Sequence, residues 1–423
     1  MIKQFFRSFF LGLLLAGTTT GVLYAQETSG AGILLRNATI IDGRAHVKPY
    51  QGSILIEDGL IKKITKKNIS VGEDVLQLDC TGKYIVPGLV EAHMHLATGD
   101  LSDRDKAKVS TDRILLNMVH HGITTVRDMA GDAPYLAEYK SKIEKGELVG
   151  PEIFYAAQFA GPGYFEMFSR GSRTKMGTKA WERAISDTTD IEKVVKEAKS
   201  AGVTAIKTYA ELSKETMRKI VKSARKEGLL VWSHATVFPI QPTDAVGLSV
   251  NSISHAADVI FEQIPKDSLT LSYAWSQVYK GLKVDQKVLS PLFVLMKKNK
   301  VYFDPTIFHA TNNNLHYAIE ITRLAHRAGV KIVCGTDWIY PEDAAMVPLY
   351  NEALIYKEEV GLSALEVLES LTYNAALVTG LKDRGYLARG MRADLLLLDK
   401  NPMENIKALF QPYRVVLKGN IVK

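Results

Sequence analysis

Short apolar stretches recur along the chain, and most of them are followed by a segment in which apolar residues return with helical spacing. The apolar stretches are rich in β-branched residues, as expected of parallel strands buried on both faces. They cover residues 85–95, 124–129, 152–157, 205–210, 230–235, 252–257, 301–307 and 331–337. The pattern therefore predicts eight buried strands.

The segments between these strands carry start and stop signals for helices. One segment begins at Ser213, a good N-cap residue, and ends at Gly228, which suits the position after a helix. Ser363 and Glu366 have the spacing of a capping box. Eight strands that alternate with helices predict an α/β fold, a (β/α)₈ TIM-like barrel over residues 85–385.

The two flanks of this region have a different pattern. Residues 31–84 and 386–423 contain short alternating strands, with turn signals such as Asp58-Gly59. Neither flank is long enough to bury a good core by itself. We therefore expect both chain ends to build one small composite β-sandwich domain beside the barrel.

Residues 1–25 have the composition of a signal peptide. Lys3 and Arg7 precede a short apolar core, and Ala25 offers a small residue for cleavage. The apolar core is short for a membrane span, so an uncleaved anchor is the minor alternative. The leader predicts export to the periplasm or the medium, with no stable membrane insertion after cleavage.

Charge and cysteine content restrict the kinds of partner and the state of the cysteines that can be expected. The net charge of the whole chain is +7, and no basic cluster interleaved with aromatic residues is present, so nucleic acid is not expected as a partner. The chain has two cysteines, and Cys334 lies in an apolar stretch that predicts a buried thiol. A small-molecule substrate fits this composition, and homo-oligomerisation stays open.

Polar residues that can bind metals stand at the ends of the predicted strands. His93 and His95 are two residues apart, so on a strand both imidazoles face the same side. Each residue alone also fits a structural role, such as a hydrogen-bonded core histidine or a helix cap. In a barrel, however, the carboxyl ends of the strands converge on one site. The residues that converge there are His93, His95, Lys207, His234, His255 and Asp337.

Several motifs resemble those of the amidohydrolase superfamily, in particular its prolidase-like and imidazolonepropionase-like branch. They are "VPGLVEAHMH" in the first strand, "TTVRDM" and "IKTYA" in the second and fourth, and "LTYNAALVTGLKDRGYLARGMRADLLLLD" near the C-terminus. The resemblance covers nearly all of the chain after the leader. It implies a metal-dependent hydrolase with its active site at the carboxyl end of the barrel.

The resemblance also implies a binuclear metal site. A protonated Lys207 would repel metal ions, whereas a Lys207 carbamylated by CO₂ is an anion that can bridge two of them. An ion pair of Lys207 with an acid is the structural alternative. Imidazole and carboxylate ligands suit zinc, with manganese, iron or cobalt as alternatives. By analogy, one ion is bound by His93, His95, Lys207 and Asp337, and the other by Lys207, His234 and His255.

The same resemblance assigns catalytic roles. Two metal ions can activate water and polarise a carbonyl, and Asp337 then accepts the proton and passes it to the leaving amine. Tyr209, on the same face of its strand as Lys207, is a candidate hydrogen-bond donor to the developing oxyanion, with a packed aromatic ring as the alternative.

Departures from the family pattern bear on the substrate. Deaminase-type relatives carry a glutamate shortly after the fifth-strand histidine, and residues 234–239, "HATVFP", contain no acid. A Gly-Gly-His-Gly turn of many prolidase-like relatives is also absent from residues 158–171. The segment 158–190 is a candidate lid, and its basic residues could bind a carboxylate or form a solvated loop. Those basic residues are Arg170, Arg173 and Lys175, and the further candidates to line the pocket are Asp304, His309 and Asn312.

These observations predict an exported amidohydrolase that cleaves the C–N bond of a dipeptide or an N-acyl amino acid. A second enzymatic interpretation is hydrolysis of a cyclic amide or a lactone by the same metal ions. A metal-bound scaffold without catalysis is the non-enzymatic alternative, although all six candidate ligands are present.

Overall fold

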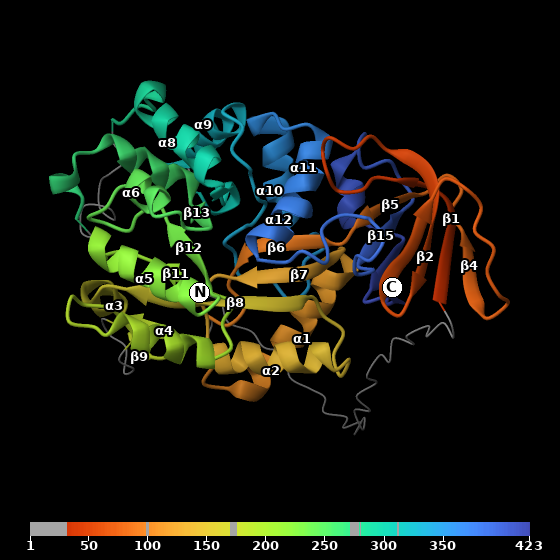
Figure 1. Ribbon diagram of the computed structural model, residues 1–423, viewed down its shortest axis with the longest axis horizontal. Helices are drawn as coiled ribbons and strands as arrows, with labels where there is room; N and C mark the ends of the chain where they lie inside the picture. The colour runs from red at the N-terminus through yellow and green to blue at the C-terminus, as the bar shows by residue number, and fades with distance from the viewer. Residues whose placement is uncertain (1–31, 99–100, 170–175, 271–278, 280, 311–312) are drawn as a thin grey trace, which may run out of the picture.

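The computed structural model describes residues 32–98, 101–169, 176–270, 279, 281–310 and 313–423. The predicted leader lies outside these residues. Figure 1 shows a helix-covered barrel beside a smaller sheet domain that contains strands from both ends of the chain. Within the described residues, no helix is long and apolar enough to cross a membrane.

Seven of the eight predicted strands form a nearly closed parallel barrel. Neighbouring strands pair in parallel from β6 through β7, β8, β11, β12 and β13 to β14. The strands are β6 (Leu89–Met94), β7 (Ile123–Asp128), β8 (Glu152–Ala160), β11 (Ala205–Thr208), β12 (Leu230–His234), β13 (Ser252–Ser254) and β14 (Tyr302–Asp304).

The eighth predicted strand, residues 331–337, is not a regular strand, and that prediction is corrected. The segment still closes the barrel, because Val333 N–H donates to Phe303 O at 2.8 Å and Ala92 N–H donates to Cys334 O at 3.1 Å. At Gly335 the segment approaches β6 so closely that a Cβ would lie 2.5 Å from His93 N. This close approach brings the following residues against the end of β6. Cys334 is a buried free thiol, as predicted.

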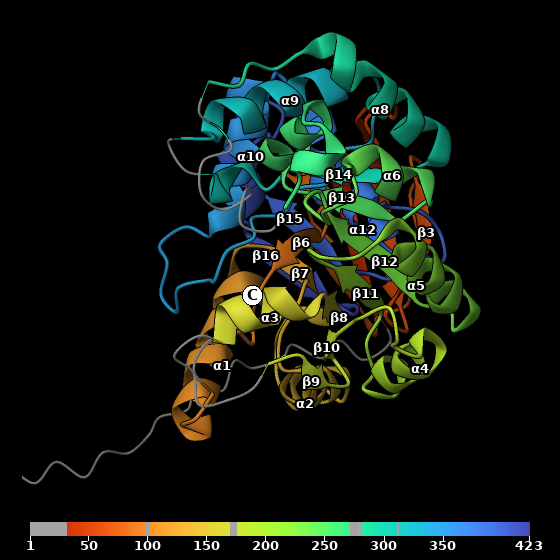
Figure 2. The same ribbon diagram turned by 90° about the vertical axis from the view of Figure 1, so that its left-hand side faces the viewer.

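Helices surround the barrel strands (Figure 2). The N-cap of α5 is Ser213, whose Oγ accepts from Thr216 N–H at 3.1 Å, and α11 begins with the predicted Ser363–Glu366 capping box. The α-helices are α1 (Arg104–His120), α2 (Ala133–Glu144), α3 (Pro162–Ser169), α4 (Ile191–Ser200), α5 (Lys214–Lys226), α6 (Pro242–Gly247), α8 (Gln286–Asn299), α9 (Leu315–Arg327), α10 (Pro348–Ile355), α11 (Ala364–Leu371) and α12 (Tyr373–Val378).

Short helical turns and a hairpin complete the barrel domain. The 3₁₀ turns are η1 (Ala256–Gln263), η2 (Lys266–Ser268), η3 (Ile307–His309) and η5 (Ile406–Phe410), and η4 (Tyr356–Val360) is a π-helical turn after α10. Within the candidate lid, β9 (Thr178–Lys179) and β10 (Glu182–Ala184) form a hairpin whose second strand pairs with the end of β8.

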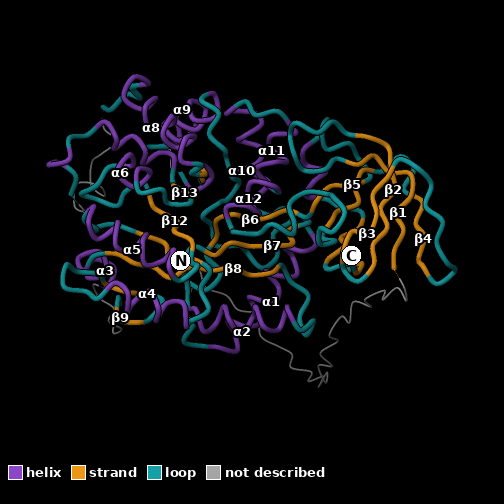
Figure 3. Tube along the Cα trace, viewed as in Figure 1, coloured by secondary structure: helices purple, strands orange, loops and turns teal. Residues whose placement is uncertain are grey.

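The second domain is one mostly antiparallel sheet in the order β17-β16-β15-β5-β1-β2-β3, with β4 beside β1 (Figure 3). Ile33, Ile54, Leu395 and Val416 share one core, so strands from both chain ends pack together. The strands are β1 (Gly32–Ile40), β2 (Tyr50–Glu57), β3 (Leu60–Thr65), β4 (Val75–Asp79), β5 (Tyr84–Pro87), β15 (Leu395–Leu398), β16 (Arg414–Leu417) and β17 (Asn420–Ile421).

The stretch 85–95, predicted as one strand, is divided between the two domains. β5 pairs with β15 in the sheet domain, whereas β6 is the first barrel strand. Gly88 lies between them and contacts Thr124 so closely that a Cβ on Gly88 would be 2.3 Å from Thr124 Oγ1. Only glycine fits this passage of the chain from one sheet to the other.

Candidate active site

His93 and His95 lie at the carboxyl end of β6 and face the same place. The Nδ1 atom of His93 lies 2.7 Å from Asp304 Oδ2, and Nδ1 of His95 lies 2.9 Å from the backbone oxygen of Ala130. Because both Nδ1 atoms contact oxygen acceptors, both Nε2 atoms point toward Asp337. Nε2 of His93 lies 3.3 Å from Oδ1 of Asp337, and Nε2 of His95 lies 3.0 Å from the same oxygen.

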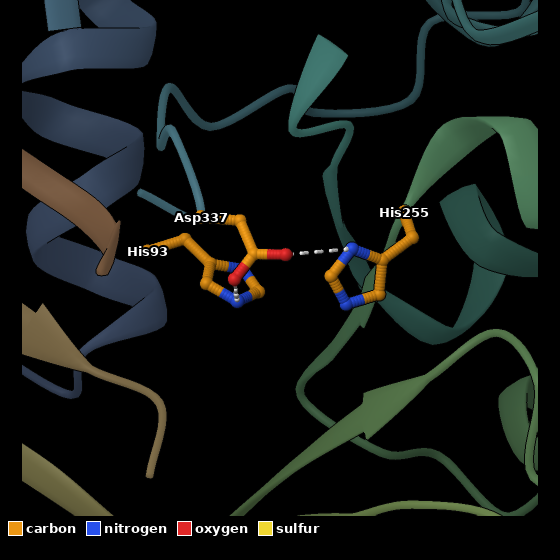
Figure 4. Close-up of side chains that lie close together, drawn as sticks. All are labelled: His93, His255 and Asp337. Carbon is orange, nitrogen blue, oxygen red and sulfur yellow. Dashed lines mark ion pairs between the residues drawn. The ribbon is translucent and has the colours of Figure 1, made fainter. Parts of the chain in front are cut away.

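Asp337 joins the first and sixth strand ends of the barrel. Its backbone has the left-handed φ of 55°, and its N–H donates to His93 O at 2.7 Å. One carboxylate oxygen is directed at His93 and the other lies 3.5 Å from Nδ1 of His255 (Figure 4). The ligand atoms of these three residues lie within 4.8 Å of one another. The structure thus brings together residues about 240 positions apart in the sequence.

Charge and burial set the protonation of this group. Burial alone would raise the pKa of Asp337, but the charge of His93 and the hydrogen bond of His95 hold it well below its usual range. Burial lowers the pKa of His95, yet the hydrogen bond and the charge of Asp337 outweigh burial and raise it to about 9. Without a metal ion, Asp337 is therefore ionised and is paired with His95.

His234 and His255 stand side by side, with ring centroids 4.0 Å apart. Nδ1 of His234 accepts from Thr236 N–H at 3.1 Å, and Nδ1 of His255 lies 3.0 Å from Thr306 Oγ1. Burial lowers the pKa of both imidazoles well below the usual range. Both rings are therefore neutral at pH 7, which is the form that binds metal ions.

Lys207 is fully buried on β11, and its Nζ donates to Ser254 Oγ at 2.7 Å. No carboxylate of the described chain forms an ion pair with Nζ, so the predicted structural alternative is not present there. Burial lowers the pKa of Lys207 to about 7. A large fraction of this amine is consequently neutral and nucleophilic at neutral pH.

Tyr209 follows β11 and is packed among aromatic rings. Its ring centroid lies 5.6 Å from that of His234 and 5.4 Å from that of Tyr164. Tyr209 therefore lies beside the histidine pair, but no described contact joins its hydroxyl to Asp337. Both interpretations of this residue, oxyanion donor and packed ring, stay predictions.

The sequence suggested that Asp304 lines the pocket. This prediction is wrong, because Asp304 is completely buried behind His93. Its Oδ2 accepts from Nη2 of Arg127 at 2.6 Å and from Ser254 Oγ at 3.1 Å, in addition to its contact with His93. Arg127 lies over the ring of Trp232. The arginine was not predicted, although a charged residue inside the apolar strand "TTVRDM" was a signal for such a buried pair.

Glu91 is a second supporting residue that sequence reasoning missed. It is buried and accepts from His93 N–H at 2.9 Å and Thr336 N–H at 3.0 Å, so it links β6 to the segment that carries Asp337. Tyr340 Oη also donates to Glu91 at 2.5 Å. Burial raises the pKa of Glu91 to about 7. Its place two residues before His93 was the available signal.

A cavity of about 400 Å³ opens next to the histidine pair and Asp337. His309 lines it, as predicted, whereas Asn312 and the basic residues Arg170, Arg173 and Lys175 lie outside the described residues. Asp258 is an unpredicted acidic residue of its wall, and burial raises the pKa of Asp258 to about 6. The lining residues are His234, Thr236, His255, Ala256, Ala257, Asp258, Phe261, Tyr279, Pro305, Thr306, His309, Ala310, Asn314, Ala318 and Asp337.

The donor set of this site fits divalent metal ions. Nε2 of His93 is buried and, among the described residues, lies 3.3 Å from Asp337 Oδ1 without a properly oriented hydrogen bond, so the protein itself leaves this nitrogen unsatisfied. Buried polar atoms of this kind are rare unless a ligand completes them. Neutral imidazoles beside a carboxylate are the ligands that zinc and related metals prefer.

The barrel, its carboxyl-end cluster of histidines and the acid after the eighth segment define a hydrolase of the TIM-barrel type. Residues 84–422 match the model of the amidohydrolase family, and the chain belongs to this family. The family generally uses divalent metals, and its members of the prolidase and ochratoxinase type are hydrolases of amide or peptide C–N bonds. This protein is accordingly a C–N hydrolase.

Particular relatives show the range of this similarity. The chain is 25% identical over 353 residues to a dihydroorotase of Thermoanaerobacter, covering 83% of this chain and 68% of the relative. It is 24% identical over 379 residues to the ochratoxinase of Aspergillus niger, covering 79% and 74%. The solved ochratoxinase structure has a TM-score of 0.72 at 20% identity, covering 93% and 96%. A Xaa-Pro dipeptidase with bound methionine also has a TM-score of 0.72, at 21% identity, covering 92% and 99%. The structural likenesses show the shared fold.

Proposed function

We propose that the protein is a binuclear metal-dependent amidohydrolase that cleaves a linear C–N amide bond, in a dipeptide or an N-acyl amino acid. The observation that carries the proposal is the position of Asp337, whose two oxygens are directed at His93 and His95 on one side and at His255 on the other. A carboxylate held between the imidazoles of His93 and His95 and that of His255 suits both metal binding and proton transfer.

The residues present would hold two ions, with zinc as the favoured metal. His93, His95 and Asp337 would bind one ion, His234 and His255 the other, and Lys207 both. When bound, the metal ions supply an activated water molecule and polarise the scissile carbonyl. Asp304 and the backbone of Ala130 orient the first two imidazoles, as second-layer acceptors do in metal sites.

Lys207 requires a chemical change to serve as a ligand. The neutral amine attacks the carbon of CO₂, an N–C bond forms, and one proton leaves the nitrogen for solvent. The product is a carbamate anion with two oxygens. Burial supports this step because it lowers the pKa of Lys207 to about 7, which makes the reactive neutral amine abundant.

We assign the proton transfer in this reaction to Asp337. Its pKa is well below the usual range, so it is ionised and accepts a proton at a carboxylate oxygen when water attacks the carbonyl carbon. The same oxygen then returns the proton to the leaving amine, since a C–N bond breaks readily only when the nitrogen leaves as a neutral amine. Tyr209 is the candidate donor to the carbonyl oxygen, because its ring lies beside that of His234.

Two observations support a linear amide. The structural neighbours include a Xaa-Pro dipeptidase and the ochratoxinase of Aspergillus niger. In addition, no acid occurs at positions 235–239 to protonate a ring nitrogen. The similarity to a dihydroorotase favours a second candidate, hydrolysis of a cyclic amide by the same residues. Export through the N-terminal leader is also part of the proposal.

Metal analysis and a substrate panel test the function. The purified protein should contain about two divalent ions and should release amines from dipeptides or N-acyl amino acids. Cyclic imides, lactones and aminopyrimidines form the comparison set. Activity on cyclic amides alone would select the second candidate, and an active enzyme without metal would refute the metal-dependent mechanism.

A further inference from the structure

Asp258 is a charged residue in the wall of the cavity beside the histidine pair, and the reaction proposed above does not use it. It lies on η1, three residues after His255, and its side chain keeps 19% of its surface exposed. The described residues that line the cavity include no lysine or arginine. The cavity wall is thus acidic at this point, without a basic residue of the described lining to neutralise it.

The hydrogen bonds that the described residues make to Asp258 leave part of its carboxylate unused. Tyr279 Oη donates to Oδ1. On the other side, Oδ2 is 3.8 Å from Nδ1 of His234, but this nitrogen already accepts from Thr236 N–H and so has no proton for Asp258. An ionised carboxylate offers about four acceptor positions. The exposed part of this carboxylate can therefore accept further hydrogen bonds from a group that enters the cavity.

We propose that Asp258, held by Tyr279, is the subsite that binds a protonated amine of the substrate. The inference rests on the proposed function and makes it more specific. Of the two proposed substrate classes, a dipeptide carries a free α-amino group near the scissile bond, whereas a simple N-acyl amino acid carries none. The same carboxylate could instead bind an amine at the end of a side chain. The shared chemistry is an ammonium group within reach of Oδ2.

Matched substrates separate these cases. Alanyl-phenylalanine and propionyl-phenylalanine differ only by the α-amino group, and 6-aminohexanoyl-phenylalanine and hexanoyl-phenylalanine differ only by a distal amine. Phenylalanine is chosen for the leaving position because Trp338 follows Asp337 directly in the chain and its ring centroid lies 5.3 Å from that of Phe308, so aromatic surface is available near Asp337. We expect at least one amine-bearing substrate to have about a tenfold or larger advantage in kcat/KM over its partner, since a hydrogen bond to a charged group is worth that much.

Two variants test whether Asp258 causes the preference. Asp258→Asn should remove the advantage of the amine-bearing substrate and leave kcat/KM for its partner within about threefold of the wild type, because uncharged acyl groups make no use of the charge. Tyr279→Phe should also reduce the advantage of the amine-bearing substrate, because Asp258 loses the hydroxyl that donates to it. The phenylalanine ring can keep the stacking on Tyr317. Glu262→Gln is the matched control, since Glu262 lies on the same turn but accepts from Thr243 N–H outside the cavity lining.

Metal content is measured in each variant. An equal fall of activity on both members of a pair, accompanied by metal loss, would show that Asp258 positions His234 and would overturn the inference. Hydrolysis by the wild type without any amine preference would also overturn it while leaving the proposed function intact. Failure to hydrolyse any linear amide would refute the proposed function, and the inference would fall with it.

Discussion

Oδ2 of Asp304 lies 2.7 Å from Nδ1 of His93, and the same oxygen also accepts from Arg127. Asp304 therefore fixes the orientation of a metal-binding candidate from inside the barrel, and its charge is balanced by a buried guanidinium. Nε2 of His93 is the atom that this contact directs toward Asp337. The relationship explains how a fully buried histidine is kept ready for a ligand.

The variant Asp304→Asn should weaken metal binding about 10–100-fold, as loss of a second-layer acceptor generally does. The amide cannot balance the charge of Arg127, so the free energy of unfolding should fall as well. Calorimetric titration with Zn²⁺ and thermal melting of the metal-free protein separate the two effects. Asp267→Asn, at an exposed position on η2, is the control and should change neither. Unchanged metal affinity in Asp304→Asn would contradict the orienting role.

Asp337→Ala should lower kcat by about a thousandfold or more, because a metal ligand and the proton carrier are removed together. The fold should persist, since the link from position 337 to β6 is made by its backbone N–H and not by its side chain. Initial rates at saturating metal, with circular dichroism as the control for folding, measure this. His93→Ala is expected to behave in the same way. Retention of a tenth of the wild-type rate would exclude the proposed role of Asp337.

Lys207→Ala should also abolish turnover, and short carboxylic acids such as propionate should restore part of it by replacing the carbamate oxygens. The carbamate itself is measurable by ¹³C NMR after incubation with ¹³CO₂, with the signal present in the wild type and absent in the variant. Lys214→Ala changes a surface lysine of α5 and serves as the control. Full activity of the untreated variant would rule out a bridging lysine.

Acid should weaken the contact between the barrel and the sheet domain through Glu152. Its Oε2 accepts from Nη1 of Arg384 at 2.9 Å and also pairs with Arg392. Burial alone would raise the pKa of Glu152, but the charges of both arginines outweigh it and lower the pKa from 4.5 to about 2. A lowered pKa in the folded state stabilises the protein above about pH 4.5, and this contribution disappears as the pH falls toward 2.

The pKa shift of Glu152 corresponds to about 3 kcal/mol of the free energy of unfolding. Glu152→Gln should therefore lower the free energy of unfolding by an amount of that order at pH 7, and by about half of it or less near pH 3. Urea unfolding at the two pH values, monitored on metal-free protein, is the measurement. Glu144→Gln, which removes a surface partner of Lys140, should cost less than about 1 kcal/mol. A pH-independent difference for Glu152→Gln would show that packing, not charge, decides the effect.

The sequence predicted the barrel because local spacing carries that information. The pair His93 and His95 follows the two-residue period of a strand, and Ser213 and Ser363 cap helices where the pattern placed them. Positions that depend on contacts between distant segments were missed. The break at Gly88 depends on Thr124, and the irregular eighth segment depends on the close approach of Gly335 to His93.

The sequence predicted a set of candidate ligands, of which the structure brings His93, His255 and Asp337 within 4.8 Å of one another, but it did not predict their surroundings. The candidate ligands lie close to the carboxyl ends of the strands or of the irregular eighth segment, and the barrel brings these ends together whatever the intervening sequence. Asp304, in contrast, also ends a strand, yet its side chain lies behind His93 because Arg127 and Ser254 draw it inward. Asp258 faces the cavity because the 3₁₀ turn η1 follows His255, and no sequence pattern predicted that turn.

The pairing of β5 with β15 has a consequence for how the chain folds. Tyr84 is paired with Leu398, about three hundred residues later, so this part of the sheet cannot form until nearly the whole polypeptide has emerged from the ribosome. Closing so long a loop is slow, and β5 meanwhile has an unsatisfied edge next to the first barrel strand. The nascent protein should therefore depend on chaperones that shield exposed strand edges, and C-terminal truncations should aggregate before they lose any residue of the catalytic centre.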